Sequence, residues 1–190
     1  MTFNQDQPAY ISLRDQVGER TKRLLVWAGA GLSAGAKMPT WAQLKNNLID
    51  AARLKSKTLD SSSRIKAEKT IITVLNEKNP WVGFKVLRDE LLGPTSYQDE
   101  VKRSFQLADS APVPNAYKNI WRLPIQGVLN LNIDRIATRA IQEIKPSTTP
   151  HEFSGDQAGN LTHVLNGVRP FIANLHGTLD NVSTWVFTHE

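Results

Sequence analysis

The sequence contains no cysteine among its 190 residues. This absence excludes disulfides, thiolate zinc sites, iron–sulfur clusters and cysteine nucleophiles. The four histidines are His151, His163, His176 and His189, and they stand too far apart in the chain to place two metal ligands on one helix. We therefore predict that the protein binds no metal.

Long apolar runs are also absent. The chain has no stretch of about 18 consecutive apolar residues, and its first twenty residues are polar and include Asp6, Arg14, Asp15 and Glu19. Both observations argue against a membrane span and a signal peptide, so we expect a cytoplasmic protein without membrane contact. With 40% hydrophobic residues the chain can bury a core, and we expect residues 1–190 to form one domain.

Acidic residues are fewer than basic ones. The 23 Lys and Arg against 18 Asp and Glu leave a net charge of +5, which favours attraction of polyanions and phosphate-bearing ligands. The densest basic stretch, residues 53–69, has no aromatic residue that could stack on a nucleic-acid base. We interpret it as a solvated helical face in preference to a nucleic-acid groove.

Short apolar runs at residues 24–27, 128–131, 171–175 and 185–187 are typical of strands buried on both faces. Helical spacing follows the second run, from Ile133 to Ile144, and ends before Pro146. A further helix is expected from Tyr10 to Thr21, and residues 147–169 are expected to form a loop with room for one short element. Strands that alternate with helices predict an α/β fold: a Rossmann-like parallel sheet with helices on both faces.

Glycine is scarce in one long interval. Only Gly83 and Gly93 occur between Gly35 and Gly127, and apolar residues recur there at helical spacing. Thr40 and Gln43 match the capping box, in which two side chains satisfy free amide groups at a helix start. We predict a helical insertion over about residues 42–122, after the first strand–helix unit.

Glycines cluster directly after the first predicted strand, in Gly29-Ala30-Gly31 and then Gly35. In α/β proteins such a loop lets the pyrophosphate of a dinucleotide approach the backbone and the free amides of the following helix. The G-x-G-x-x-x-G spacing differs from the GxGxxG fingerprint of dehydrogenases and from a Walker A loop. A tight strand–helix turn with Ser33 as a cap is the alternative interpretation.

Polar residues follow two other predicted strands. Asn130, Asn132 and Asp134 leave the second strand in "VLNLNID", and His176 with Gly177 follows the third in "FIANLHG". Ligands of doubly wound sheets lie at the carboxyl ends of strands, so we expect these side chains to gather with the glycine loop. The alternatives are that Asp134 caps a helix, that Asn132 is a turn residue and that His176 is a buried histidine bonded to backbone.

These three motifs resemble the sirtuin superfamily in its broad sense, including the sirtuin-like NADases of prokaryotic antiviral defence. "GAGLSAGAKMPTW" is similar to the family's GAGxSxxxGxPxW loop, "NLNID" to its TQNID or TTNYD motif, and "NLHG" to the HG motif of its catalytic histidine. The resemblance extends from about Leu24 to the C-terminus. It departs at Asn130-Leu131, where the family has Thr-Thr or Thr-Gln, and the chain stops where the family continues, so we expect it to be incomplete at the C-terminus.

The resemblance implies a role for each matching residue. Gly29, Ala30, Gly31 and Ser33 would line the diphosphate of NAD, and Pro39 and Trp41 would shape the nicotinamide side of the pocket. Asn132 would position water or the nicotinamide ribose, and Asp134 would orient the loop or the carboxamide. His176 would act as the general base.

The resemblance also implies an activity. Sirtuin deacylases carry a four-cysteine zinc module, which this sequence lacks, so water becomes the expected acceptor. We predict an NAD hydrolase that releases nicotinamide and ADP-ribose, with NAD as substrate, as the effector of an antiviral or abortive-infection system. The alternative is a non-catalytic NAD- or nucleotide-sensing or partner-docking module of a larger assembly, and a zinc-free protein deacylase is a third interpretation. The expected partners are further copies of the chain or a sensor, which could involve nucleic acid indirectly.

Overall fold

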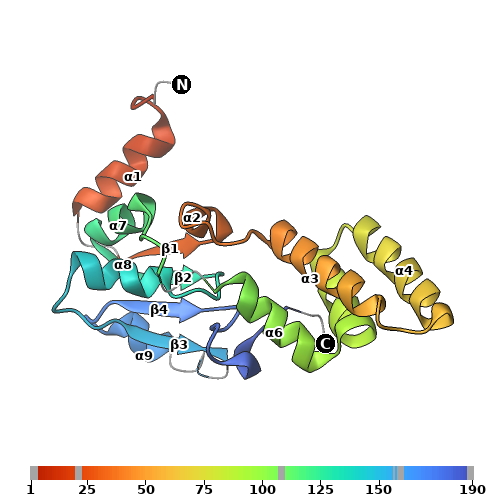
Figure 1. Ribbon diagram of the computed structural model, residues 1–190. Helices are drawn as coiled ribbons and strands as arrows, with labels where there is room; N and C mark the ends of the chain where they lie inside the picture. The colour runs from red at the N-terminus through yellow and green to blue at the C-terminus, as the bar shows by residue number, and fades with distance from the viewer. Residues whose placement is uncertain (1–3, 20–22, 107–109, 156, 158–160, 188–190) are drawn as a thin grey trace.

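The protein is built around a four-stranded parallel sheet (Figure 1). A computed structural model describes residues 4–19, 23–106, 110–155, 157 and 161–187. The strand order is β1-β2-β4-β3. The strands are β1 (Leu24–Ala28), β2 (Ile125–Asn130), β3 (His151–Ser154) and β4 (Phe171–Asn174). This arrangement confirms the predicted α/β class with a parallel sheet.

Helices make up most of the remaining described chain. The α-helices are α1 (Pro8–Glu19), α2 (Ala30–Ala34), α3 (Trp41–Ser56), α4 (Ser61–Asn76), α5 (Pro80–Val86), α6 (Pro94–Ser104), α7 (Asn115–Arg122), α8 (Ile136–Ile144) and α9 (Leu161–Asn166). A π-helix, η1 (Leu87–Leu92), continues α5, and a short 3-10 helix, η3 (Val182–Thr184), lies near the C-terminus. Among the described residues, no helix has the length and apolar character needed to cross a bilayer.

Alternate residues of the strands enter two different hydrophobic clusters. Val128 of β2 and Ile172 of β4 are partners in register and belong to the main core, together with Ile136 and Ile141 of α8. Phe171 of β4 belongs to a second cluster, which also holds Phe153, Ala173 and Val164 of α9. Since successive side chains of a strand point to opposite faces, the two clusters lie on opposite faces of the sheet.

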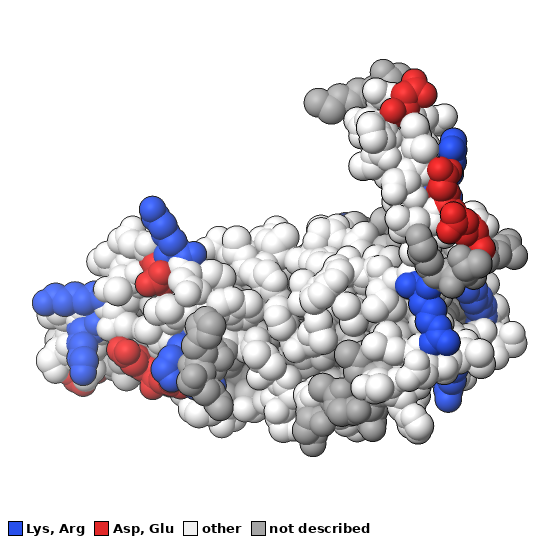
Figure 2. Space-filling model, turned by 180° about the vertical axis from the view of Figure 1, so that it is seen from behind, with Lys and Arg blue, Asp and Glu red and all other residues white. Residues whose placement is uncertain are grey.

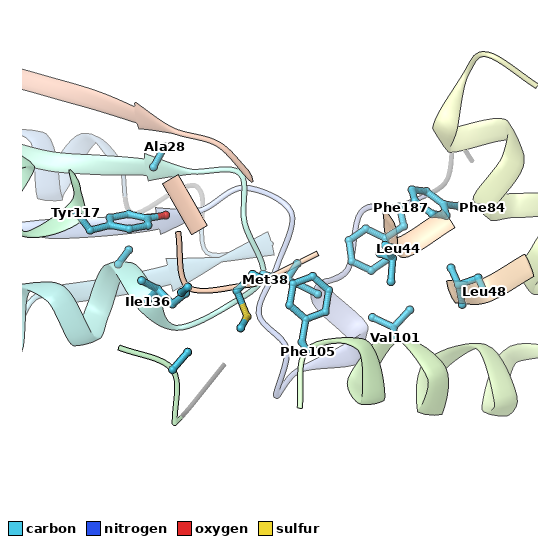
Figure 3. Packing of buried hydrophobic residues seen from close by; sticks show 14 of the residues in the cluster. Ala28, Met38, Leu44, Leu48, Phe84, Val101, Phe105, Tyr117, Ile136 and Phe187 are labelled. Carbon is cyan, nitrogen blue, oxygen red and sulfur yellow. The ribbon is translucent and has the colours of Figure 1, made fainter. Parts of the chain in front are cut away.

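The main core extends without interruption from the sheet into the helices between α2 and β2. Figure 3 shows Met38 and Phe105 between Ile136, on the sheet side, and Leu44 and Val101 in the helices. The capping box at the start of α3 is present: the Thr40 amide donates to Gln43 Oε1 at 2.8 Å, and the Gln43 amide donates to Thr40 Oγ1 at 3.3 Å. One contiguous core therefore joins the sheet to the helical part.

The prediction of a strand at residues 185–187 is wrong. That segment follows η3 as an irregular loop, held by a hydrogen bond of 2.7 Å from Trp185 Nε1 to the Thr178 carbonyl. Phe187 is 3% exposed and packs near Trp41 and Phe84, with ring centroids 5.4 and 6.2 Å away. The apolar character of this run reflects core packing in a loop, which a short pattern cannot distinguish from a strand.

Other boundaries differ less. Residues 147–169 contain two elements, β3 and α9, where we expected a loop with room for one. Strand β3 was not predicted because it is a short edge strand with exposed polar residues. Strand β2 begins at Ile125, three residues before the predicted start at Val128 and on the far side of Gly127. Helix α1 ends at Glu19 and buries no residue, and the predicted extension through residues 20–21 falls outside the described residues.

Replacing Gly127 with alanine is expected to lower the free energy of unfolding by about 1–3 kcal/mol, as overpacking in cores does. The added Cβ would lie 2.5–2.6 Å from the Phe171 ring, which is fully buried and stacked on Phe153 at 5.8 Å, so the ring has no space to retreat. Urea unfolding of the two proteins measures the difference. Gly31→Ala is the matched control, because its Cβ would meet nothing within 4 Å; equal stability of both variants would contradict the packing described here.

Candidate functional site

The parallel register brings the three motifs to one edge of the sheet. Ala28 pairs with Asn130, and Asn130 pairs with Asn174, so β1, β2 and β4 end side by side. The chain stays aligned one residue further, because the amides of Leu131 and Leu175 donate to the carbonyls of Ala28 and Asn130, both at 2.8 Å. The glycine loop, the Asn132–Asp134 segment and His176 all begin at this edge.

Neither Gly29 nor Gly31 is required by the fold of the loop. Gly29, the N-cap of α2, has φ −116°, an ordinary extended value, and Gly31 is not among the glycines with positive φ. A Cβ built on either residue meets nothing within 4 Å. The backbone there faces open space. Gly35 differs, since its Cβ would lie 3.2 Å from Pro114 Cβ.

Asn132 is held by two hydrogen-bond partners from distant segments. Its side chain is 4% exposed, and Nδ2 donates to Ser33 Oγ at 3.0 Å and to Tyr117 Oη at 2.9 Å. These two bonds use both amide hydrogens. Tyr117 lies in the interval predicted as a helical insertion, and its place in an apolar helical pattern carries no sign of the bond made by its hydroxyl.

Asn130 supports Asn132 from the preceding strand. Its Oδ1 accepts from the Asn132 amide at 3.2 Å, and its Nδ2 donates to the Asn132 carbonyl at 2.9 Å and to Asn174 Oδ1 at 3.0 Å. All three asparagines are buried. Asn130, at which the sequence departs from the sirtuin motif, therefore stabilises the loop that carries Asn132.

Asp134 lies one residue before Arg135, the N-cap of α8, and accepts a hydrogen bond from the first amide of that helix. Its Oδ1 accepts from the Ile136 amide at 3.0 Å, whereas its buried Oδ2 has no hydrogen-bond partner. Burial raises the pKa of this carboxyl above its usual 3.8, and the neighbouring Ser33 hydroxyl and the Ile136 amide oppose that rise. Binding the first amide of the helix does not explain why the second carboxylate oxygen is buried without a partner.

His176 lies among aromatic rings. Its ring centroid is 5.2 Å from that of Trp81 and 5.6 Å from that of Trp41. Burial lowers the pKa of the imidazole below 6.5, although a hydrogen bond with the Leu131 backbone acts in the opposite direction. Nδ1 is buried without a partner, so a neutral imidazole keeps a free polar nitrogen.

The loop after His176 turns back over this histidine. Gly177 has φ +84°, and a Cβ there would collide with the Thr184 carbonyl, so glycine is required at this position. The Val186 amide donates to the His176 carbonyl at 3.3 Å. The C-terminal described segment, with Phe187, thereby closes one side of the aromatic cluster.

One small pocket unites most of the predicted site residues. It is lined by Ala30, Ser33, Pro39, Trp41, Phe105, Asn132, Ile133 and Asp134, and its volume is only about 10 Å³. Gly29, Gly31 and His176 do not line it, although Trp41 contacts both the pocket and His176. Phe105, which directly follows α6 in the predicted helical insertion, lines this pocket and is 5% exposed. In this conformation the pocket is closed to a dinucleotide.

Within the described part of the chain, no group of three or more His, Asp or Glu side chains is placed to hold a metal ion, and the absence of a metal stays a prediction. No protein-family model matches the chain, and the comparison with curated proteins finds no significant match. The interpretation of the site therefore depends on its motifs and geometry.

Replacing Tyr117 with phenylalanine is expected to destabilise the fold by about 1–3 kcal/mol, the usual cost of leaving a buried polar group unsatisfied. The change keeps the ring, which is fully buried, but removes the acceptor of one Asn132 amide hydrogen. Urea unfolding measures the loss. The double variant with Asn132→Ala provides the control: if the two losses simply add, the bond contributes nothing.

The buried carboxyl of Asp134 predicts a pH dependence. Because its pKa is raised in the folded state, the folded protein binds this proton more tightly than the unfolded chain. Above pH 3.8, stability is therefore lost as pH rises through the folded-state pKa. Relative to Asp134→Asn, which keeps a capping oxygen but does not titrate, the wild type should gain stability as pH falls from 7. Urea unfolding of both proteins at several pH values measures this. A difference in unfolding free energy between the two proteins that does not change with pH would contradict the prediction.

Proposed function

We propose that this protein is a sirtuin-like NAD hydrolase that cleaves NAD to nicotinamide and ADP-ribose. The observation that carries the proposal is the bare backbone at Gly29 and Gly31. Glycine at these positions serves neither the turn nor the packing, and open space lies where each Cβ would be. A ligand that must approach the backbone closely would explain why both positions are glycine.

The polar side chains beside the loop suit the reaction. Hydrolysis breaks the bond between nicotinamide and C1′ of the ribose, water adds to C1′, and the water proton leaves with a base. A histidine whose pKa is below 6.5 is neutral at pH 7 and can accept that proton at Nδ1. The unpartnered Oδ2 of Asp134 is available to an amide or hydroxyl of the substrate.

Binding requires the pocket to widen. A volume of about 10 Å³ admits no dinucleotide, so Phe105 and Trp41 must move away from Asn132 and Asp134. Both residues belong to the helical part, α3 and the end of α6, which in this proposal is a helical insertion into a Rossmann-like unit. An NADase that opens only when triggered suits the effector of an antiviral system, which must stay inactive in an uninfected cell.

One observation favours the second candidate, a non-catalytic nucleotide-sensing module. Both amide hydrogens of Asn132 are engaged by Ser33 and Tyr117, which is a structural role. A sensing module would bind NAD at the same loop without cleaving it. Turnover separates the two functions.

The test is nicotinamide release from NAD, measured by chromatography, with NAD binding measured by calorimetry. We expect Gly31→Ala to lose binding with no loss of stability, because the methyl group meets only ligand. Gly18→Ala is its matched control, since that Cβ also meets nothing within 4 Å. His176→Ala is expected to abolish release but not binding, and His163→Ala, at an exposed position, should keep both.

Three results would count against the proposal. Unchanged NAD cleavage by the folded Asn132→Ala and His176→Ala proteins would contradict the catalytic roles assigned to these two residues. Binding without release by the wild type would support the sensing module. Equal NAD binding by Gly31→Ala and the wild type would show that the glycine loop does not contact NAD and is a tight strand–helix turn.

A further inference from the structure

A second pocket, here named the Tyr97 pocket, has a volume of about 110 Å³ and is partly open to solvent. Its lining comes from η1, α6 and the C-terminal described segment: Arg88, Tyr97, Gln98, Val182, Trp185 and Phe187. The Phe187 ring lies 5.4 Å from that of Trp41, which lines the pocket beside the glycine loop. The two pockets share no lining residue, so they are separate sites.

The hydroxyl of Tyr97 is buried and has no hydrogen-bond partner in the part of the chain that the structure describes. The other two buried atoms in this condition, Asp134 Oδ2 and His176 Nδ1, belong to the candidate NAD site. Burial raises the pKa of Tyr97 above its usual 10, so the hydroxyl stays protonated at neutral pH and can donate. Such unsatisfied groups are rare in native proteins, and each one requires an explanation.

Gln98, the next residue of α6, also has an unused polar group. Its half-buried side chain lines the pocket and forms no hydrogen bond with any residue that the structure describes. The amide supplies two donors and an acceptor, and the Tyr97 hydroxyl supplies a donor and an acceptor. Arg88, by contrast, is paired with Asp89 at 2.7 Å. The pocket therefore offers neutral hydrogen-bonding groups and does not select for an anion.

The remaining wall of the pocket is apolar and mostly aromatic. The rings of Trp185 and Phe187 lie 5.3 Å apart at 36°, and Val182 adds aliphatic surface. Trp185 Nε1 donates to the Thr178 carbonyl at 2.7 Å, so the indole N–H is already used and its ring is fixed. An apolar cavity of about 150 Å³ holds benzene. A partly open pocket of about 110 Å³ therefore suits one six-membered ring.

The backbone of η1 is also unusual, because it is a π-helix between α5 and α6. Such helices are rare and occur frequently at functional sites. Arg88 lies in this π-helix, and Tyr97 and Gln98 lie in the helix that follows it.

We propose that the Tyr97 pocket binds a single six-membered aromatic ring with hydrogen-bonding groups on its edge, such as the base of a pyrimidine nucleoside. The ring packs against Trp185 and Phe187, and the sugar stays at the open side. The Tyr97 hydroxyl and the Gln98 amide bind the edge of the ring. Aromatic contact and two hydrogen bonds supply the affinity. This site is independent of the proposed NAD hydrolysis.

The probes are cytidine and ribose, titrated by calorimetry. Both are uncharged, because Lys and Arg side chains at both ends of the molecule would attract a phosphorylated probe without using the pocket (Figure 2). Cytidine contains no nicotinamide, adenine or diphosphate, so its binding is a measurement separate from that of NAD. Ribose lacks the base and should not bind at concentrations at which cytidine does.

Tyr97→Phe is the variant that tests the proposal most directly. It keeps the ring and removes only the hydroxyl, and no hydrogen bond with a described residue is lost. We expect cytidine binding to weaken about tenfold, with no decrease in the free energy of unfolding in urea. Gln98→Ala should weaken binding similarly. Trp27→Leu and Gln142→Ala, at exposed positions outside the pocket, are the matched controls and should bind cytidine as the wild type does.

Four outcomes would overturn the inference. The first is that the folded wild type binds no cytidine at millimolar concentration, and the second is that ribose binds as well as cytidine. Binding lost in Trp27→Leu but kept in Tyr97→Phe would place the nucleoside on the exposed tryptophan of β1. A Tyr97→Phe protein that is less stable but binds cytidine normally would give the hydroxyl a structural role. None of these results alters the test of NAD cleavage.

Discussion

The buried side-chain amide of Asn132 is the interaction on which the candidate site depends. It joins Ser33 of α2, Tyr117 of α7 and the end of β2, which are far apart in the sequence. Asn130 and Asn174 extend the same network across two strands. In a low-dielectric interior such bonds are strong, and each missing partner leaves a costly unsatisfied group. The network therefore fixes the glycine loop, the strand ends and the neighbouring helix in one arrangement.

That arrangement also explains why the site is closed. Both side-chain amide hydrogens of Asn132 are engaged, Asp134 accepts from the first amide of α8, and Phe105 and Trp41 line the small pocket beside them. The unused polar atoms, Asp134 Oδ2 and His176 Nδ1, are buried beside these groups. A polar atom without a partner is rare in protein interiors, and in the proposed function these two atoms contact the ligand when the aromatic residues move.

Much of the fold could be predicted from local pattern. Strand β4 is a continuous apolar run because all four of its residues are buried, and the capping box of α3 depends only on residues three positions apart. Strand β1 is equally apolar, but the prediction that both of its faces are buried is wrong: it is an edge strand, with Leu25 and Trp27 exposed by 38% and 64%. Strand β3 was missed because an exposed edge strand needs no apolar alternation. Residues 185–187 were mistaken for a strand because their apolar side chains enter the core from a loop, and a short run does not distinguish the two.

For the site, the sequence by itself determined the residue types and their order: bare glycines after β1, Asn132 and Asp134 after β2, and His176 after β4. Parallel strands necessarily bring such positions to one edge, so their proximity could also be predicted. Only the tertiary structure decided that Tyr117 binds Asn132, that Phe105 lines the pocket and that the rings of His176 and Trp41 are in contact. These contacts depend on how distant segments pack together, and packing of that kind leaves no local signal in the sequence. A helical apolar pattern identifies the inward face of a helix but not the residues that this face contacts.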